Sequence, residues 1–139
     1  MSVEPRAVGA ITEAAADDSL PRRISIVDDD ASIREALKGL MRAARFEVEA
    51  FGSAEEFLAS EALKNTSCLI LDVYLPGMNG FDLQVRLAAE GRRIPIVFIT
   101  AHADEISRQR ALNAGAVELL SKPVRRAALF QAIQSAIQP

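Results

Sequence analysis

Cysteine is almost absent from this chain, which has one, Cys68, among 139 residues. One cysteine forms no disulfide within the chain, and no cysteine and histidine spacing typical of a zinc site occurs, which suits a reducing compartment. Cys68 lies in the most apolar run and is interpreted as a small buried hydrophobe. No apolar run approaches the ~18 residues that span a bilayer, and the amino terminus lacks a signal-peptide pattern. We therefore expect a cytoplasmic protein.

Basic charge is also scarce. The chain has 16 Lys and Arg against 19 Asp and Glu, with a net charge of −3 and a pI near 5.2. This balance predicts no basic surface for nucleic acid or for an anionic membrane. Hydrophobic residues make up 50% of the chain and charged residues 25%, as in ordinary globular domains.

The first residues differ in composition from the rest. Residues 1–21 are rich in alanine and small polar residues and show no sustained periodicity, which is typical of a mobile leader. The remaining length is enough for one domain with a hydrophobic core. We therefore predict a leader over 1–21 and a single domain over 22–139.

Apolar runs and helical patterns alternate along that domain. Such alternation predicts an α/β fold, a doubly wound parallel sheet of five strands with helices on both faces and right-handed crossovers. Two S-x-x-E sequences, at Ser32 and Ser53, have the form of helix capping boxes. The expected strands are 24–27, 46–51, 68–73, 94–100 and 117–121, and the expected helices are about 32–45, one opening at Ser53, 80–90, 104–114 and 124–138.

Polar groups stand where the apolar strands end. Asp28 and Asp29 follow the first strand, Asp72 ends the third, Thr100 ends the fourth, and Lys122 follows the fifth. Parallel strands bring such groups to one edge of the sheet. Crowded carboxylates repel one another unless a cation intervenes, and carboxylates with carbonyl oxygens suit Mg²⁺.

Three acids, a divalent cation, a lysine and a threonine together form a site for a phosphoryl group. The sequence has no P-loop and no G-x-G-x-x-G motif to hold a nucleotide. A carboxylate can itself accept the phosphoryl group, as in aspartyl-phosphate chemistry. Asp72, which closes a buried strand, is the acceptor we predict.

Four signals in order now match a family. They are the acidic pair in IVDDD, the segment D-x-x-L-P-G-M-N-G from Asp72, the hydroxyl in FITAH, and the A-G-A…S-K-P run that ends at Pro123. Over residues 22–139 the chain resembles the receiver domain of two-component response regulators. The resemblance implies the flavodoxin-like receiver fold with strand order 2-1-3-4-5.

The resemblance also assigns roles to residues. Asp72 matches the phosphoacceptor, Thr100 the switch hydroxyl and Lys122 the phosphate-binding lysine, and the Lys122–Pro123 peptide is expected to be cis. The metal, Mg²⁺, is expected on Asp29 and Asp72 directly, on the backbone carbonyl of Tyr74, and on Asp28 through water.

The family further implies that the domain catalyses its own phosphorylation and dephosphorylation rather than acting as a turnover enzyme. A sensor histidine kinase is the expected phosphodonor, and the 104–138 face is expected to form a homodimer or to bind a target. Two positions depart from the family pattern. Leu119 stands where the family usually carries an aromatic residue that reports phosphorylation, and Val124 stands where Phe is frequent. Both changes fall on the 104–138 face.

Other interpretations concern single residues and the whole chain. Asp30 is expected to lie in a loop without a metal role, and His102 in an exposed loop where it could limit water access. The chain is also similar to receivers that precede helix-turn-helix output domains, so it could be the regulatory half of a transcription factor. A flavodoxin-like ligand-binding module is a third candidate, disfavoured by the acidic edge because flavin phosphate is anionic.

Overall fold

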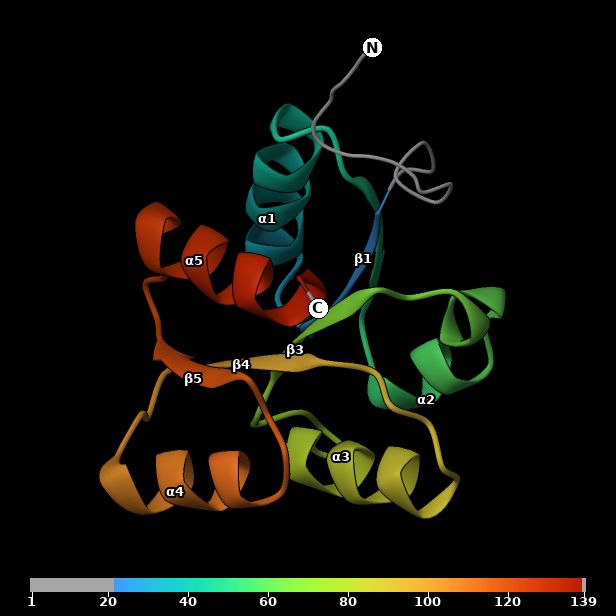
Figure 1. Cartoon of the computed structure of the whole chain (residues 1–139), viewed down its shortest axis with the longest axis vertical. Helices are drawn as coiled ribbons and strands as arrows, with labels where there is room; N and C mark the ends of the chain where they lie inside the picture. Colours follow the sequence, from blue (N-terminus) through green and yellow to red (C-terminus); the bar gives the residue numbers. More distant parts are fainter. Residues whose placement is uncertain (1–21, 139) are drawn as a thin grey trace, which may run out of the picture.

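The computed structural model describes residues 22–138, which form a five-stranded parallel sheet with helices on both faces (Figure 1). The strand order is β2-β1-β3-β4-β5, so the predicted fold class and topology are confirmed. The predicted leader, 1–21, lies outside the described residues. The strands are β1 (Arg23–Val27), β2 (Glu47–Phe51), β3 (Cys68–Asp72), β4 (Ile96–Thr100) and β5 (Glu118–Ser121).

Burial along the strands follows their position in the sheet. Every residue of β3 and of β4 is buried, because both strands lie inside the sheet and are covered on both faces. The edge strand β2 alternates between exposed and partly buried residues up to Phe51. The prediction for β4 was two residues too long, since Pro95 has no N–H to donate to the ladder and pairing with β3 starts at Ile96.

The helices also differ in detail from the prediction. Arg45 has a φ of 70° and Phe46 N–H donates to Met41 O, so these two residues close the first helix and β2 begins only at Glu47. A short 3-10 helix, η2, was not predicted. The helices are α1 (Ala31–Ala43), α2 (Ala54–Leu58), η2 (Glu61–Lys64), α3 (Gly80–Ala89), α4 (Glu105–Asn113) and α5 (Arg126–Ile137).

The capping box predicted at Ser32 was wrong. The cap of α1 is Asp30, whose Oδ1 accepts hydrogen bonds from the N–H groups of Ser32 and Ile33 and starts the helix at Ala31. Asp30 lies in the loop between β1 and α1, as expected. Ser53 does cap α2, but Glu56 accepts the N–H of Gly52 rather than that of Ser53. The reciprocal capping box that the structure contains joins Asn79 and Asp82 at the start of α3, which the sequence interpretation missed.

Two apolar clusters fill the space between the helices and the sheet. On one face α1 and α5 cover Ile24, Ile26 and Ile70, and Figure 1 shows these helices side by side above the sheet. On the other face α2, α3 and α4 cover Leu69 and Phe98. No helix within residues 22–138 is long and apolar enough to cross a bilayer.

Cys68 belongs to the cluster under α1 and α5 and is fully buried. Burial raises the pKa of its thiol to about 12. The prediction of a small buried hydrophobe is confirmed, since a thiol with so high a pKa stays protonated at neutral pH.

Candidate functional site

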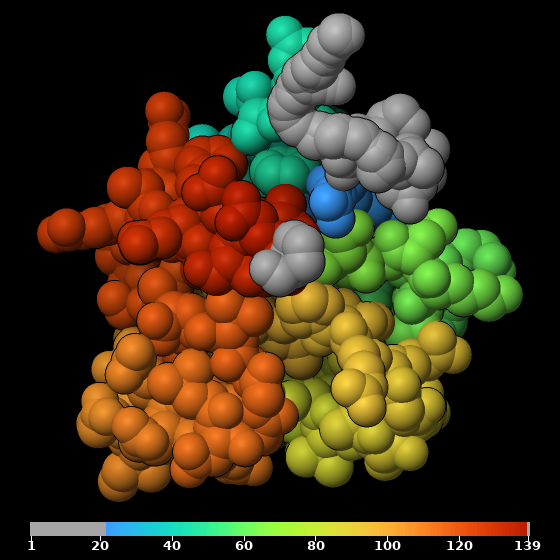
Figure 2. Space-filling view, in the orientation of Figure 1, coloured from blue at the N-terminus to red at the C-terminus, as the bar shows by residue number. Residues whose placement is uncertain are grey.

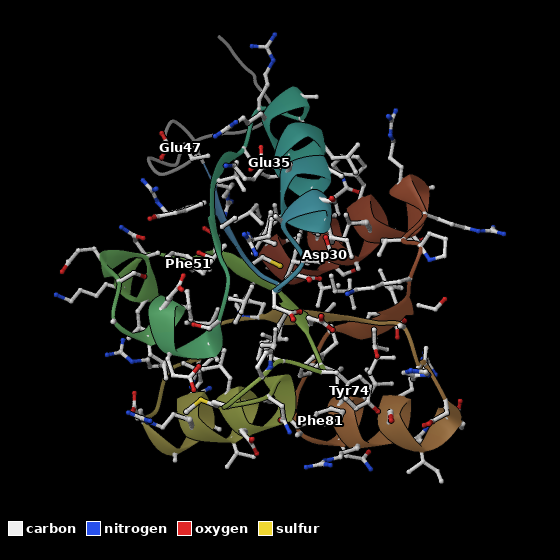
Figure 3. The ribbon with its side chains drawn as sticks, turned by 180° about the vertical axis from the view of Figure 1, so that it is seen from behind. Asp30, Glu35, Glu47, Phe51, Tyr74 and Phe81 are labelled. Carbon is white, nitrogen blue, oxygen red and sulfur yellow. The ribbon has the colours of Figure 1, made fainter. Side chains whose placement is uncertain are left out.

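The predicted polar groups meet at the carboxyl edge of the sheet. Val27 pairs with Leu71, and Thr100 pairs with Ser121, so the residues that follow β1 and β5 come level with the ends of β3 and β4. Figure 3 shows Asp30 at the start of α1 and Tyr74 beyond the end of β3, both beside this edge. The structure thus brings the strand-end residues of four strands to one place.

Three carboxylates form the centre of this edge. Asp28, Asp29 and Asp72 each place an oxygen within 4.8 Å of the others'. Asp28 is fully buried and Asp72 is 4% exposed, whereas Asp29 faces solvent. The backbone holds Asp28 on both sides, because its N–H donates to Phe51 O and its carbonyl accepts Arg34 Nη1 at 2.7 Å. Arg34 is a contact that the sequence interpretation missed.

Lys122 joins two of these acids. Its Nζ lies 2.9 Å from Asp28 Oδ2 and 3.0 Å from Asp72 Oδ2, and it donates a hydrogen bond to Asp72. The Lys122–Pro123 peptide is cis, as predicted. The lysine therefore neutralises one charge of the cluster, which leaves two of its three carboxylates uncompensated when all are ionised.

The pKa values of Asp72 and Lys122 show which of the two charges the site stabilises. Burial raises the pKa of Asp72, Lys122 lowers it and Asp28 raises it again, so that it lies above the ordinary value. Burial lowers the pKa of Lys122, but contact with Asp28 and Asp72 outweighs burial and the net shift is upward. The ammonium is thus held charged, while the negative charge on Asp72 is not fully compensated.

The residues fit a hard divalent cation. Asp28 Oδ2 is buried and has no aligned hydrogen bond within the described chain, so a lone pair is available beside the other two carboxylates. No hydrogen bond among residues 22–138 ends on the Tyr74 carbonyl either. Carboxylate and carbonyl oxygens are the ligands that Mg²⁺ prefers, and a cation would relieve the remaining repulsion.

Thr100 lies at this edge, but it does not bond to Asp72 within the described residues. Its Oγ1 accepts the N–H of His102 at 3.1 Å, and its carbonyl accepts the N–H of Lys122 at 2.8 Å. His102 is exposed, as expected, and its ring packs edge-on against Tyr74 with 5.8 Å between ring centroids. The two aromatic side chains therefore join the loop after β3 to the loop after β4.

Leu119 points into the core rather than toward solvent. It is 4% exposed, pairs with Phe98 across the β4–β5 ladder, and belongs to the cluster under α3 and α4. Beside it, Glu118 accepts a two-pronged hydrogen bond from Arg108 of α4, with distances of 3.0 and 3.3 Å. The link from β5 to α4 is thus an ion pair next to a buried aliphatic side chain.

Comparison with known proteins identifies the family. Residues 24–134 match the response regulator receiver domain. The chain is 45% identical to nodulation protein W of Bradyrhizobium diazoefficiens over 133 residues, 96% of this chain and 57% of that protein. It is 36% identical to the transcriptional regulatory protein FixJ of the same organism over 115 residues, covering 83% of this chain and 56% of FixJ.

The solved structures agree. The response regulator StyR superposes with a TM-score of 0.79 at 46% identity, covering 86% of this chain and 60% of StyR. The chain belongs to the response regulator receiver domain family of two-component signalling. Receiver domains generally bind Mg²⁺ at an acidic cluster, are phosphorylated by histidine kinases and are connected to output domains. The chain spans a little over half the length of nodulation protein W and FixJ.

Proposed function

We propose that Asp72 of this receiver accepts a phosphoryl group from the phosphohistidine of a histidine kinase. A carboxylate oxygen of Asp72 forms the new P–O bond while the P–N bond breaks and its electron pair returns to the imidazole. When bound, Mg²⁺ neutralises charge on the phosphoryl oxygens. Asp29, Asp72 and the Tyr74 carbonyl are the groups we assign to direct contact with the ion, and Asp28 to contact through water.

Lys122 and Thr100 are the residues we assign to the negative charge of the transferred phosphoryl group. Lys122 is already 3.0 Å from Asp72, and we assign it to the phosphoryl oxygens, where its positive charge offsets theirs. Thr100 would exchange the N–H of His102 for a phosphoryl oxygen as its partner. Because Thr100 and Lys122 share a backbone hydrogen bond, movement of one is transmitted to the start of the β5–α5 turn.

The observation that carries this proposal is the meeting of three carboxylates with one lysine. A buried acidic cluster with a single cation is unfavourable by itself, and a bound divalent cation would relieve the repulsion and offset the charge of an incoming phosphoryl group. Such an arrangement is expected at a functional site rather than at a purely structural one.

Phosphate uptake tests the proposal directly. The chain is incubated with Mg²⁺ and acetyl phosphate, and intact mass measures the phosphoryl groups bound. We expect one per chain in the wild type, none in Asp72→Asn, and unchanged uptake in Asp82→Asn, a variant at an exposed capping residue of α3. Uptake that survives Asp72→Asn removes the assignment.

Two further proposals concern the binding partners of the chain and its location in the cell. The α4–β5–α5 side forms one continuous surface, orange to red in Figure 2, and we propose that phosphorylation alters its binding of a second copy or of an output partner. The name of FixJ, a transcriptional regulatory protein, favours an output in transcription as the second candidate function.

The family match favours the receiver over a flavodoxin-like module. Response regulators are typically cytoplasmic, and we propose that location.

A further inference from the structure

The loop between β3 and α3, residues 73–79, carries the backbone group assigned to the metal. It leaves Asp72, presents the Tyr74 carbonyl, and returns where Gly80 N–H donates to Val73 O at 2.8 Å. Gly80 packs so closely on the Asp72 backbone that a Cβ at this position would collide with the Asp72 carbonyl. Both ends of the loop are therefore fixed, and its middle decides where the Tyr74 carbonyl points.

One side chain from elsewhere in the fold holds that middle. Glu55, in the first turn of α2, accepts the Met78 N–H through Oε2 at 3.0 Å. The Tyr74 N–H also donates to Asp72 Oδ1 at 3.3 Å. Among the described residues, the Glu55 bond is the one hydrogen bond that ties residues 74–78 to a helix or strand other than β3; Leu75 and Met78 add apolar packing.

The turn is shaped to receive this carboxylate. Gly77 has a φ of 73°, a left-handed conformation that glycine adopts without strain. A Cβ at Gly77 would lie 2.8 Å from Glu55 Oε2, so the glycine also leaves room for the acid. The same N–H contact lowers the pKa of Glu55, so the carboxylate stays ionised at neutral pH and the bond is charge-assisted.

We propose that Glu55 is a positioning residue of the phosphorylation site, whose carboxylate fixes the Gly77–Met78 turn and thereby orients the Tyr74 carbonyl toward the metal. The inference rests on the proposed function, because it takes Tyr74 as a metal ligand. Glu55 itself touches neither the metal position nor Asp72 in any described contact. It acts through the backbone, as partners of metal ligands commonly do.

A purely local role for Glu55 is the competing explanation, since an acidic side chain in the first turn of a helix interacts favourably with the helix dipole. The neighbouring Glu56 provides the matched control. It belongs to the same turn and is also exposed, but its Oε1 accepts Gly52 N–H, 3.2 Å away, in the β2–α2 turn. Removing either acid takes one charge from the same region and from the same helix end, yet only Glu55 contacts the loop after Asp72.

The chain contains its own probe for the test. Tyr74 is its one tyrosine and there is no tryptophan, so intrinsic tyrosine fluorescence reports on this loop. Mg²⁺ is titrated into the wild type, Glu55→Ala, Glu55→Gln and Glu56→Ala, and thermal unfolding is measured without Mg²⁺. Hydrogen exchange of the Met78 amide, also without Mg²⁺, follows the bond itself.

We expect Glu55→Ala to weaken Mg²⁺ binding about tenfold and to speed exchange of the Met78 amide. Glu55→Gln, which keeps an acceptor oxygen, should recover most of both, and Glu56→Ala should change neither while lowering the unfolding temperature as much as Glu55→Ala does. Equal weakening by Glu55→Ala and Glu56→Ala, or none by either, would overturn the inference. A wild type that binds no Mg²⁺ and takes no phosphoryl group on Asp72 would instead overturn the proposed function, and the inference with it.

Discussion

Lys122 and Asp72 are joined by a 3.0 Å hydrogen bond across the carboxyl edge of the sheet, although 50 positions separate them in the chain. The same ammonium lies 2.9 Å from Asp28, so one cation is shared by two buried acids. The site is consequently held together by a group that the proposed chemistry also uses, and its stability and its function are linked.

Replacing Lys122 by alanine should therefore destabilise the protein. Asp28 and Asp72 would be left in a buried position without their cation, and the loss is expected to be about 2–3 kcal/mol in urea denaturation without Mg²⁺. Lys64→Ala is the control, because Lys64 is exposed and its ion pair with Glu61 lies on the surface, and it should cost less than about 0.5 kcal/mol. Equal losses for the two variants would show that the shared ion pair contributes nothing special.

Asp72→Asn should have the opposite effect in the absence of Mg²⁺. The pKa of Asp72 is raised, chiefly by burial, so stability is lost as the pH rises from the unfolded pKa to the folded one, and the loss is complete above the folded pKa. An amide removes that loss while Lys122 keeps Asp28 as a partner. We expect an unfolding temperature about 3 °C higher at neutral pH, with the difference shrinking as the pH falls and the wild-type carboxyl becomes protonated. A lower unfolding temperature at neutral pH would contradict the balance of charges described for the site.

The Arg108–Glu118 pair predicts a second pH dependence, on the side of the molecule that we propose for partner binding. Burial raises the pKa of Glu118, but Arg108 and the Leu119 N–H outweigh it, so the folded pKa lies below the ordinary 4.5. The pair's contribution is thus present above the unfolded pKa and is lost as the pH falls through the folded one. Glu118→Gln should cost about 0.5 kcal/mol at neutral pH and nothing at low pH, measured by denaturation at both. A difference independent of pH would indicate that the packing of the side chain matters rather than its charge.

Thr100 is expected to matter for the response more than for phosphate uptake. Thr100→Val keeps the shape of the side chain and removes the hydroxyl, so acetyl phosphate should still label Asp72. Amide chemical-shift changes on phosphorylation should be lost in α4 and around Leu119, and Thr100→Ser should restore them. Normal chemical-shift changes in Thr100→Val would show that the response of α4 and Leu119 does not depend on the Thr100 hydroxyl. Thr66→Val, on the opposite edge of the sheet, is the matched control.

The alternation of apolar runs and helices was enough to predict both the sheet and the meeting of Asp28, Asp72, Thr100 and Lys122. Parallel strands have their carboxyl ends at one edge, so residues that end strands become neighbours whatever their separation in sequence. The capping box at Ser32 was wrongly predicted because Ser32 and Asp30 both suit a cap, and only the path of the backbone after β1 selects Asp30.

The contact of Glu55 with Met78 could not be predicted in the same way. It joins a helix terminus to a loop 23 residues later, and it depends on how the Gly77 turn approaches α2, which no periodicity describes. The orientation of Leu119 could be predicted only in part. Alternation within β5 gives it a face of the sheet, whereas its contact with the cluster under α3 and α4 follows from how those helices pack.

The buried thiol of Cys68 has a practical consequence for measuring movements of α3 and α4 by labelling. A thiol with a pKa near 12 and no exposed surface should not react with maleimide or methanethiosulfonate reagents while the protein is folded. A second cysteine placed at Ile106 of α4 or at Val85 of α3, which are 83% and 62% exposed, would be labelled alone. Spin or fluorescent labels at these helices can therefore test whether the helices move on phosphorylation without removing the native cysteine.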